Sequence, residues 1–125
     1  MKILLDTDVL LWWLSGDRAL PRAAHAAIAD PETTVVVSAA SAWEIAIKQA
    51  AGRLETPDDL VDALRANDFE MLAISVAHAL AAGRLPPHHG DPFDRMLVAQ
   101  AQIEGLTLVT VDQRLPEYEV ALLAL

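Results

Sequence analysis

The chain has 125 residues, no cysteine and a formal net charge of −9 at pH 7, which excludes disulfides, thiolate metal sites and cysteine nucleophiles. Its hydrophobic fraction of 54% predicts a packed core, and the length suits a single domain covering residues 1–125. The acidic balance argues against tight electrostatic binding of nucleic acid by the bare chain, because phosphate contacts need lysine and arginine.

Strand-like and helix-like segments alternate along the chain. The pattern predicts, in order, a strand at 2–6, a helical register around 12–14, a helix at 20–28, a strand at 34–37, helices at 41–51 and 58–67, a strand at 71–74, a helix at 75–83, a loop at 84–90, a helix at 91–104, a strand at 106–110 and an edge strand at 119–123. This alternation is typical of a three-layer α/β/α fold with a mainly parallel sheet of four or five strands covered on both faces. In such sheets, ligands bind beyond the carboxyl ends of the strands.

Four carboxylates are predicted to meet at that edge of the sheet. Asp6 ends the first strand and Asp112 follows the strand at 106–110, while Glu44 and Asp94 fall in the first turns of helices at the same edge. Two such charges about 5 Å apart repel by roughly 3 kcal/mol at an effective dielectric near 20, so either some of the acids stay protonated or a cation lies among them. Ligation by oxygen alone favours Mg²⁺ or Mn²⁺, which can support phosphodiester cleavage without a protein nucleophile.

Three of the four acids also have a local structural interpretation. Ser41 and Glu44 have the spacing of a capping box, and Asp91 before Asp94 is a favourable helix start. Asp112 could simply begin a turn. Asp6 is the hardest to explain locally, because a carboxylate directly after an apolar strand is costly to bury without a partner.

Four segments, in the right order along nearly the whole chain, carry a family resemblance: LLDTDVLL at 4–11, SAASAWEI at 38–45, DPFDRMLVAQA at 91–101 and LVTVD at 108–112. They resemble the successive motifs of PIN-domain proteins, and among these the VapC-like toxins of type II toxin–antitoxin pairs. The segment at 91–95 is the most specific of them. One departure is Asp8, where many relatives carry asparagine. Its extra charge either sharpens metal binding at Asp6 or holds the turn, and we favour the turn.

The resemblance implies a divalent-metal-dependent endoribonuclease that uses Mg²⁺ or Mn²⁺. It implies that Asp6, Glu44, Asp94 and Asp112 are catalytic and metal-binding, with Asp6 and Asp94 as the surest metal ligands. It further implies an RNA substrate, a homodimer, a small cognate antitoxin, and a sheet whose first strand lies between the second and the fourth. No stretch reaches the roughly 18 apolar residues of a membrane span, and we expect a cytoplasmic protein without membrane attachment.

Hydroxyl groups and one tryptophan flank the acids in sequence. Thr7, Ser38 and Thr110 either orient ligands and water or satisfy backbone groups at strand ends. Trp43, beside Glu44, is expected in core or rim packing.

Other conspicuous residues have two interpretations each. Arg95 either contacts phosphate, neutralises the acids or makes a surface salt bridge. His88 and His89 are expected in a structural loop or against RNA rather than at a metal. Trp12 and Trp13 are adjacent and should not both face one core, so the sequence predicts that one is exposed at an interface or stacks on a base.

Two other enzyme or binding classes fit part of the pattern. A small phosphatase of the haloacid dehalogenase type would use the acids at 6 and 8, and a non-catalytic receiver-like domain would use an acidic pocket. Both need a lysine near a strand end late in the chain, and the last lysine, Lys48, lies within a predicted helix. A binding subunit with a vestigial site also fits the sequence.

Overall fold

The computed structural model describes residues 1–52 and 59–125, so the start predicted for the helix at 58–67 lies outside the described residues. Its strands are β1 (Lys2–Leu5), β2 (Thr34–Ser38), β3 (Glu70–Leu72) and β4 (Thr107–Val109). Its helices are α1 (Thr7–Ser15), α2 (Arg22–Ala29), α3 (Ala39–Ala50), α4 (Leu60–Ala66), α5 (Val76–Arg84), α6 (Pro92–Glu104) and the short 3₁₀ helix η1 (Leu115–Glu117). None of the described helices is both long and apolar enough to cross a bilayer.

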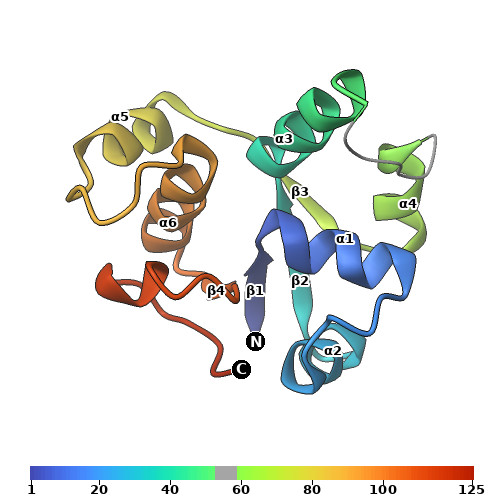
Figure 1. Cartoon of the computed structure of the whole chain (residues 1–125). Coiled ribbons are helices and arrows are strands. Elements are labelled where there is room, and N and C mark those ends of the chain that lie inside the picture. The colour runs from blue at the N-terminus through green and yellow to red at the C-terminus, as the bar shows by residue number, and fades with distance from the viewer. Residues whose placement is uncertain (53–58) are drawn as a thin grey trace.

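The four strands form one parallel sheet in the order β3-β2-β1-β4. The predicted central place of the first strand, between the second and the fourth, is confirmed (Figure 1). Because all strands run the same way, their carboxyl ends lie at one edge, and α1 and α3 begin there immediately after β1 and β2.

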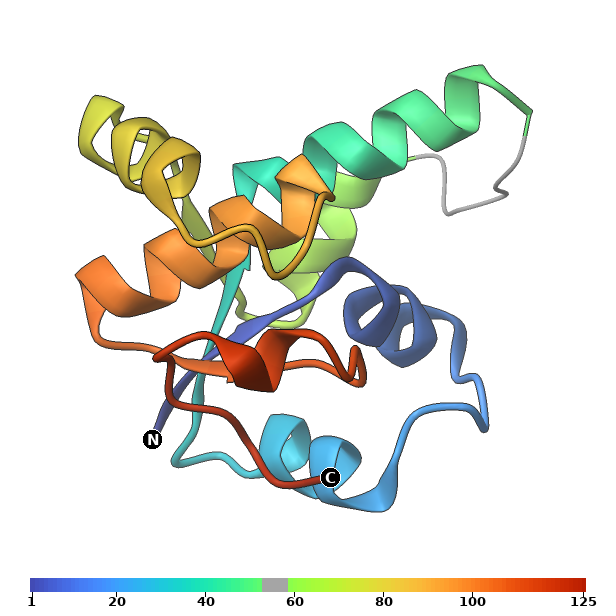
Figure 2. The same cartoon turned by 60° about the vertical axis from the view of Figure 1, so that its left-hand side comes forward.

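Helices cover both faces of the sheet, as the sequence predicts. Alternate residues of β1 supply the two cores, because successive side chains of a strand point to opposite faces. Ile3 and Leu5 pack with residues of α1, α2 and α4, whereas Leu4 packs with residues of α6 and the segment around η1. Figures 1 and 2 show α1, α2 and α4 on one side of the sheet and α5 and α6 on the other.

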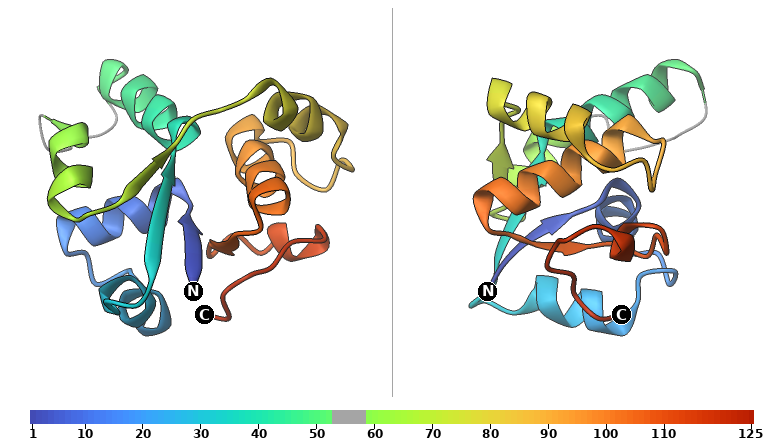
Figure 3. Two further views of the ribbon diagram at one scale, coloured as in Figure 1. Left: turned by 180° about the vertical axis from the view of Figure 1, so that it is seen from behind. Right: turned by 90° about the vertical axis from the view of Figure 1, so that its left-hand side faces the viewer.

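The helix α3 stands at the end of the sheet and contributes to both cores. Ala40 belongs to the α6 side and Ile45 to the α1 side. Seen from behind, the chain leaves β3 and crosses to α5, which packs on α6 (Figure 3). The buried Gln100 on α6 holds the segment between β3 and α5 against the end of β2. Its side-chain N–H₂ donates to the carbonyl of Ala73, and its side-chain oxygen accepts from the hydroxyl of Ser38.

Two predicted strand boundaries are wrong. The third strand covers Glu70–Leu72 rather than 71–74, since the carbonyl of Ala73 accepts from Gln100 instead of from a neighbouring strand. The edge strand at 119–123 is reduced to one parallel bridge between Leu108 and Leu122. There the N–H of Val120 donates to the carbonyl of Tyr118, two residues back, and this tight turn interrupts the extended chain.

Candidate metal-binding and catalytic site

Asp6 lies where β1 becomes α1 and is only 5% exposed. It caps the helix, since its Oδ1 accepts from the N–H of Val9 at 2.9 Å. Burial raises the pKa of Asp6 to about 6; hydrogen bonds from Thr110 and Val9 oppose the rise, and the charges of Asp8 and Glu44 add to it. This carboxyl is therefore costly to ionise where it stands.

Asp94 lies in the first turn of α6, which starts at the predicted cap Asp91. Its pKa is raised to about 7, mainly by burial and then by the charge of Asp91; His89 opposes the rise, and Asp6 and Asp112 add to it. The charges of Asp6 and Asp112 are thus close enough to Asp94 to disfavour its ionised form.

Asp112, just beyond β4, is well supplied with donors. Burial acts to raise its pKa, but the backbone N–H of Arg114 and the side chains of His89 and Arg114 outweigh burial, and the pKa is lowered. The Arg114 N–H donates to Oδ1 at 2.9 Å, and the Arg114 Nε lies 3.4 Å from the same oxygen. Asp112 thus carries its charge with support from the protein.

Glu44 is held differently from the sequence prediction. The helix α3 begins at Ala39 with Ser38 as its cap, so Ser41 is not the cap and Glu44 lies in the second turn rather than the first. The capping-box interpretation is wrong, because the helix is capped by Ser38, whose hydroxyl accepts a hydrogen bond from the N–H of Ala40. The Glu44 carboxylate instead accepts from the hydroxyl of Thr7 at 2.6 Å and pairs with Lys48 at 3.2 Å.

The four acids therefore come to one edge of the sheet but differ in their neighbours. Glu44 and Asp112 each have a basic partner, whereas within residues 1–52 and 59–125 neither Asp6 nor Asp94 is paired with a lysine or arginine. The structure thus places a basic side chain beside two of the four acids, Glu44 and Asp112.

His89 is the site residue that the sequence interpretation missed. Its Nε2 lies 2.8 Å from Asp112 Oδ2 and 3.1 Å from Asp94 Oδ2, and the three residues offer atoms within 4.8 Å of one another. The sequence placed this histidine in a structural loop or against RNA and did not predict its contacts with the acids. The usable signal was its place in the longest loop, two residues before the cap of the helix that carries Asp94.

Among the described residues, Arg95 forms no ion pair with the four acids or with any surface carboxylate. Its guanidinium donates to the carbonyls of Ala82 at 2.9 Å and Leu85 at 2.8 Å, at the end of α5, and to those of Pro86 and His89 in the following loop. Last-turn carbonyls of a helix lack partners and attract cations. Arg95 therefore shapes the loop that carries His89.

The structure decides between the alternatives for the tryptophans. Trp43 is 62% exposed and makes an edge contact with Phe93 at a ring-centroid distance of 5.2 Å, so of the two predicted places, core or rim, it is not in the core. Trp12 and Trp13, near the end of α1, are both half-buried and pack against the same core, so the expectation that they could not both face one core is wrong. The indole of Trp13 donates to the side chain of Asn67 at 3.0 Å.

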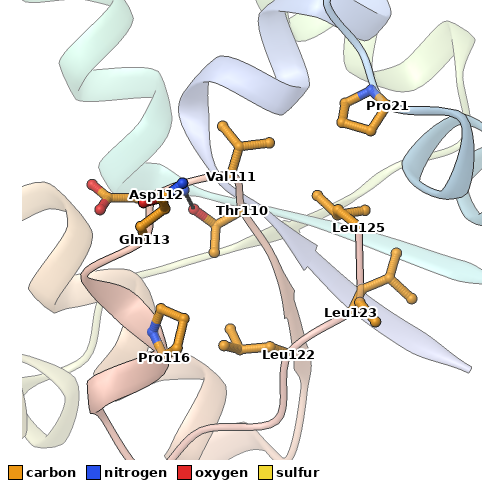
Figure 4. A pocket seen from close by; sticks show the side chains of 10 residues that line it. Pro21, Thr110, Val111, Asp112, Gln113, Pro116, Leu122, Leu123 and Leu125 are labelled. Atoms are coloured by element: carbon orange, nitrogen blue, oxygen red, sulfur yellow. Dashed lines mark hydrogen bonds between the residues drawn. The ribbon is translucent and has the colours of Figure 1, made fainter.

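A hollow of about 530 Å³ lies behind Asp112, between the end of β4 and the C-terminal residues. Figure 4 shows the Asp112 carboxylate pointing away from the apolar side chains of Leu122, Leu123 and Leu125 that line it. The Asp112 carboxylate thus faces away from this hollow.

A divalent cation suits this set of side chains. Within residues 1–52 and 59–125, neither the buried Asp6 nor the half-buried Asp94 has a lysine or arginine partner, and their ionised forms would gain most from an added positive charge. The carboxylate oxygens that the four acids offer are the ligands that Mg²⁺ and Mn²⁺ prefer.

The fold and the site together define a class of protein. The family model of the PIN domain matches residues 3–121, and the chain belongs to this family. The resemblance noted in the sequence is confirmed by a curated relative, Ribonuclease VapC22 of Mycobacterium tuberculosis, which is 33% identical over 116 residues, covering 90% of this chain and 88% of the relative.

Solved structures share the fold at lower identity. A chain of VapBC2 from Rickettsia felis, solved with a DNA fragment from its promoter, has a TM-score of 0.70 and 15% identity, covering 98% of this chain and 97% of that one. A chain of FitAcB from Neisseria gonorrhoeae has a TM-score of 0.64 and 16% identity, covering 99% and 97%. A chain of a toxin–antitoxin complex from Klebsiella pneumoniae has a TM-score of 0.59 and 21% identity, covering 88% and 86%.

Proposed function

We propose that this chain, acting as a single PIN-like domain over residues 1–125, is a Mg²⁺- or Mn²⁺-dependent endoribonuclease and the toxin of a toxin–antitoxin pair. The observation that carries the proposal is the pair Asp6 and Asp94, one buried and one half-buried, at the carboxyl end of a parallel sheet. Burial raises the pKa of both carboxyls, and no lysine or arginine among the described residues pairs with either. Membership of the PIN family and the relationship to Ribonuclease VapC22 support ribonuclease chemistry.

In this proposal Asp6 and Asp94 hold the metal directly, and Glu44 and Asp112 complete its surroundings. A bound divalent ion would supply an activated water and would stabilise the leaving oxygen of the phosphodiester. The protein residues orient the acids: the hydroxyl of Thr7 fixes one Glu44 oxygen, and the N–H of Arg114 fixes one Asp112 oxygen. The exposed guanidinium of Arg114 and the ammonium of Lys48 stand at the edge of the site and can attract phosphate.

The proposal predicts metal-dependent cleavage of RNA. Purified protein should cut single-stranded RNA in Mg²⁺ or Mn²⁺, and excess EDTA should reduce the rate by at least about a thousandfold, the size of effect expected when metal stabilisation worth about 4 kcal/mol is removed. Gel analysis of a labelled RNA with and without EDTA measures this. Turnover of small phosphomonoesters without RNA cleavage would favour the haloacid dehalogenase-like chemistry instead.

We also propose a homodimer in the cytoplasm that is inhibited by a small cognate antitoxin. The structural relatives are described as toxin–antitoxin complexes or as VapBC and FitAcB, which supports an antitoxin partner. Exposed apolar side chains on α3 and α5, including Trp43, Ile47, Val76 and Leu80, support an apolar contact surface.

The dimer is testable without the antitoxin. Sedimentation equilibrium at about 10 μM should give twice the chain mass, since a stable interface usually buries well over about 1,000 Å². Leu80→Glu, which places a charge on the α5 surface, should shift the mass towards the monomer. Ile103→Glu offers a comparison on another exposed apolar position. A wild-type monomer under these conditions would contradict the proposal.

A further inference from the structure

His89 connects two of the acids through one nitrogen. Its side chain is 3% exposed, and Nε2 lies within hydrogen-bond distance of Oδ2 of both Asp94 and Asp112. These acids belong to different elements, α6 and the segment after β4. The imidazole is therefore the direct link between them, and its protonation pattern decides what it can do there.

The other ring nitrogen fixes that pattern. The backbone N–H of Asp91 donates to His89 Nδ1 at 3.0 Å. An N–H can only donate, so Nδ1 acts as an acceptor and the ring proton is on Nε2. Nε2 consequently presents an N–H to the two carboxylates and has no free lone pair for a metal.

The backbone of His89 is also held on both sides. Its N–H donates to the hydroxyl of Tyr118 at 2.9 Å, and its carbonyl accepts from Arg95 at 3.3 Å. The Tyr118 hydroxyl in turn donates to the carbonyl of Pro86 at 2.9 Å. Such support from several segments is what keeps a side chain in one orientation.

We propose that His89 is a positioning residue whose Nε2–H spans Asp94 and Asp112 and sets the placement of their oxygens, rather than a metal ligand. This inference rests on the proposed function. Because Nε2 is occupied by its proton, the site offers oxygen ligands only, which favours Mg²⁺ and Mn²⁺ over ions such as Zn²⁺ that bind imidazole well.

The first test reads the tautomer directly. Nitrogen-15 spectra of the four histidines, with His89 assigned by its loss in His89→Gln, should show a protonated Nε2 and an unprotonated Nδ1 in metal-free protein at neutral pH. The same pattern should persist after Mg²⁺ is added. A protonated Nδ1, or a change at Nε2 that indicates coordination, would overturn the proposal.

The second test measures Mn²⁺ affinity by electron paramagnetic resonance of the free ion. His89→Leu, which removes the donor, should weaken binding about 10–100-fold, the range typical for residues that orient metal ligands. His89→Gln, which keeps an N–H₂ donor near the Nε2 position, should recover most of that loss. The control His88→Gln changes the neighbouring histidine, which pairs with Glu117 away from the acids, and should leave affinity within about twofold of wild type.

The possible results separate the two levels of the proposal. Equal loss in His89→Gln and His89→Leu, or no loss in either, would overturn the positioning role. If circular dichroism shows that His89→Leu does not fold, the nitrogen-15 spectrum of the wild type and the Mn²⁺ affinity of His89→Gln still test the positioning role. Wild-type protein that binds no Mn²⁺ would overturn the proposed metal-dependent function, and the metal-free tautomer would then show separately whether His89 is oriented as inferred.

Discussion

Asp94→Asn is expected to abolish RNA cleavage and metal binding while making the metal-free protein more stable. Burial raises the pKa of Asp94 to about 7, so at about pH 8 the metal-free fold carries an ionised carboxylate in an unfavourable place. A neutral amide removes that cost, which is about 4 kcal/mol for a rise of about 3 pKa units and on the order of 3 kcal/mol once solvent screening of the partly exposed carboxyl is included. The melting temperature should therefore rise by several degrees.

The same substitution should lower the cleavage rate by at least about a thousandfold, corresponding to a loss of about 4 kcal/mol of transition-state stabilisation. Thermal melts in EDTA and cleavage assays in Mg²⁺ measure the two effects. Asp68→Asn is a matched control: Asp68 is exposed, and its positive φ of 57° suits asparagine equally well. Cleavage near the wild-type rate by Asp94→Asn would contradict the assigned role.

The stabilisation by Mg²⁺ should depend steeply on pH. The folded-state pKa values of Asp6 and Asp94, about 6 and about 7, lie above their ordinary value of 3.8. Their protonated forms therefore stabilise the metal-free fold below about pH 4, and this contribution is lost as the pH rises through about 6 to 7. A cation reverses this loss, because it stabilises the ionised forms and displaces the protons.

Melting temperatures with and without Mg²⁺ should thus be nearly equal at about pH 5 and diverge progressively up to about pH 8. Asp112 should not contribute, because its pKa is lowered and it is ionised throughout this range. In the double variant Asp6→Asn, Asp94→Asn the divergence should vanish. A Mg²⁺ effect of constant size from about pH 5 to 8 would show that these two carboxyls do not govern binding.

Those elements of the site that depend on local pattern were predictable from the sequence. Asp6 at a strand end and Asp91 as a helix cap were both placed correctly, since apolar runs and Asp-Pro helix starts are local signals. The parallel sheet followed from the alternation of elements, whereas the strand order was implied only by the family resemblance. Glu44 was misplaced within its helix, because both Ser38 and Ser41 fit a local capping pattern. The serine that caps the helix is Ser38, whose hydroxyl also bonds to Gln100, a residue distant in sequence.

The contacts of His89 and Arg95 could not be predicted in the same way. His89 meets Asp112 across 23 positions of sequence, and no periodicity encodes that meeting. Arg95 follows Asp94 directly, so the sequence suggested a role for it among the acids. In the structure the helix turns its side chain to the carbonyls at the end of α5 instead.

The uneven pairing of the four acids has a consequence for substrate approach. Among the described residues, Lys48 and Arg114 pair with Glu44 and Asp112, whereas no lysine or arginine pairs with Asp6 or Asp94. A single divalent ion would then balance the ionised forms of Asp6 and Asp94, although Asp8 and Asp91 add negative charge nearby and the chain as a whole carries −9. A polyanionic strand would meet a less repulsive site with the ion than without it, so the ion would affect whether RNA can come near as well as whether it is cut.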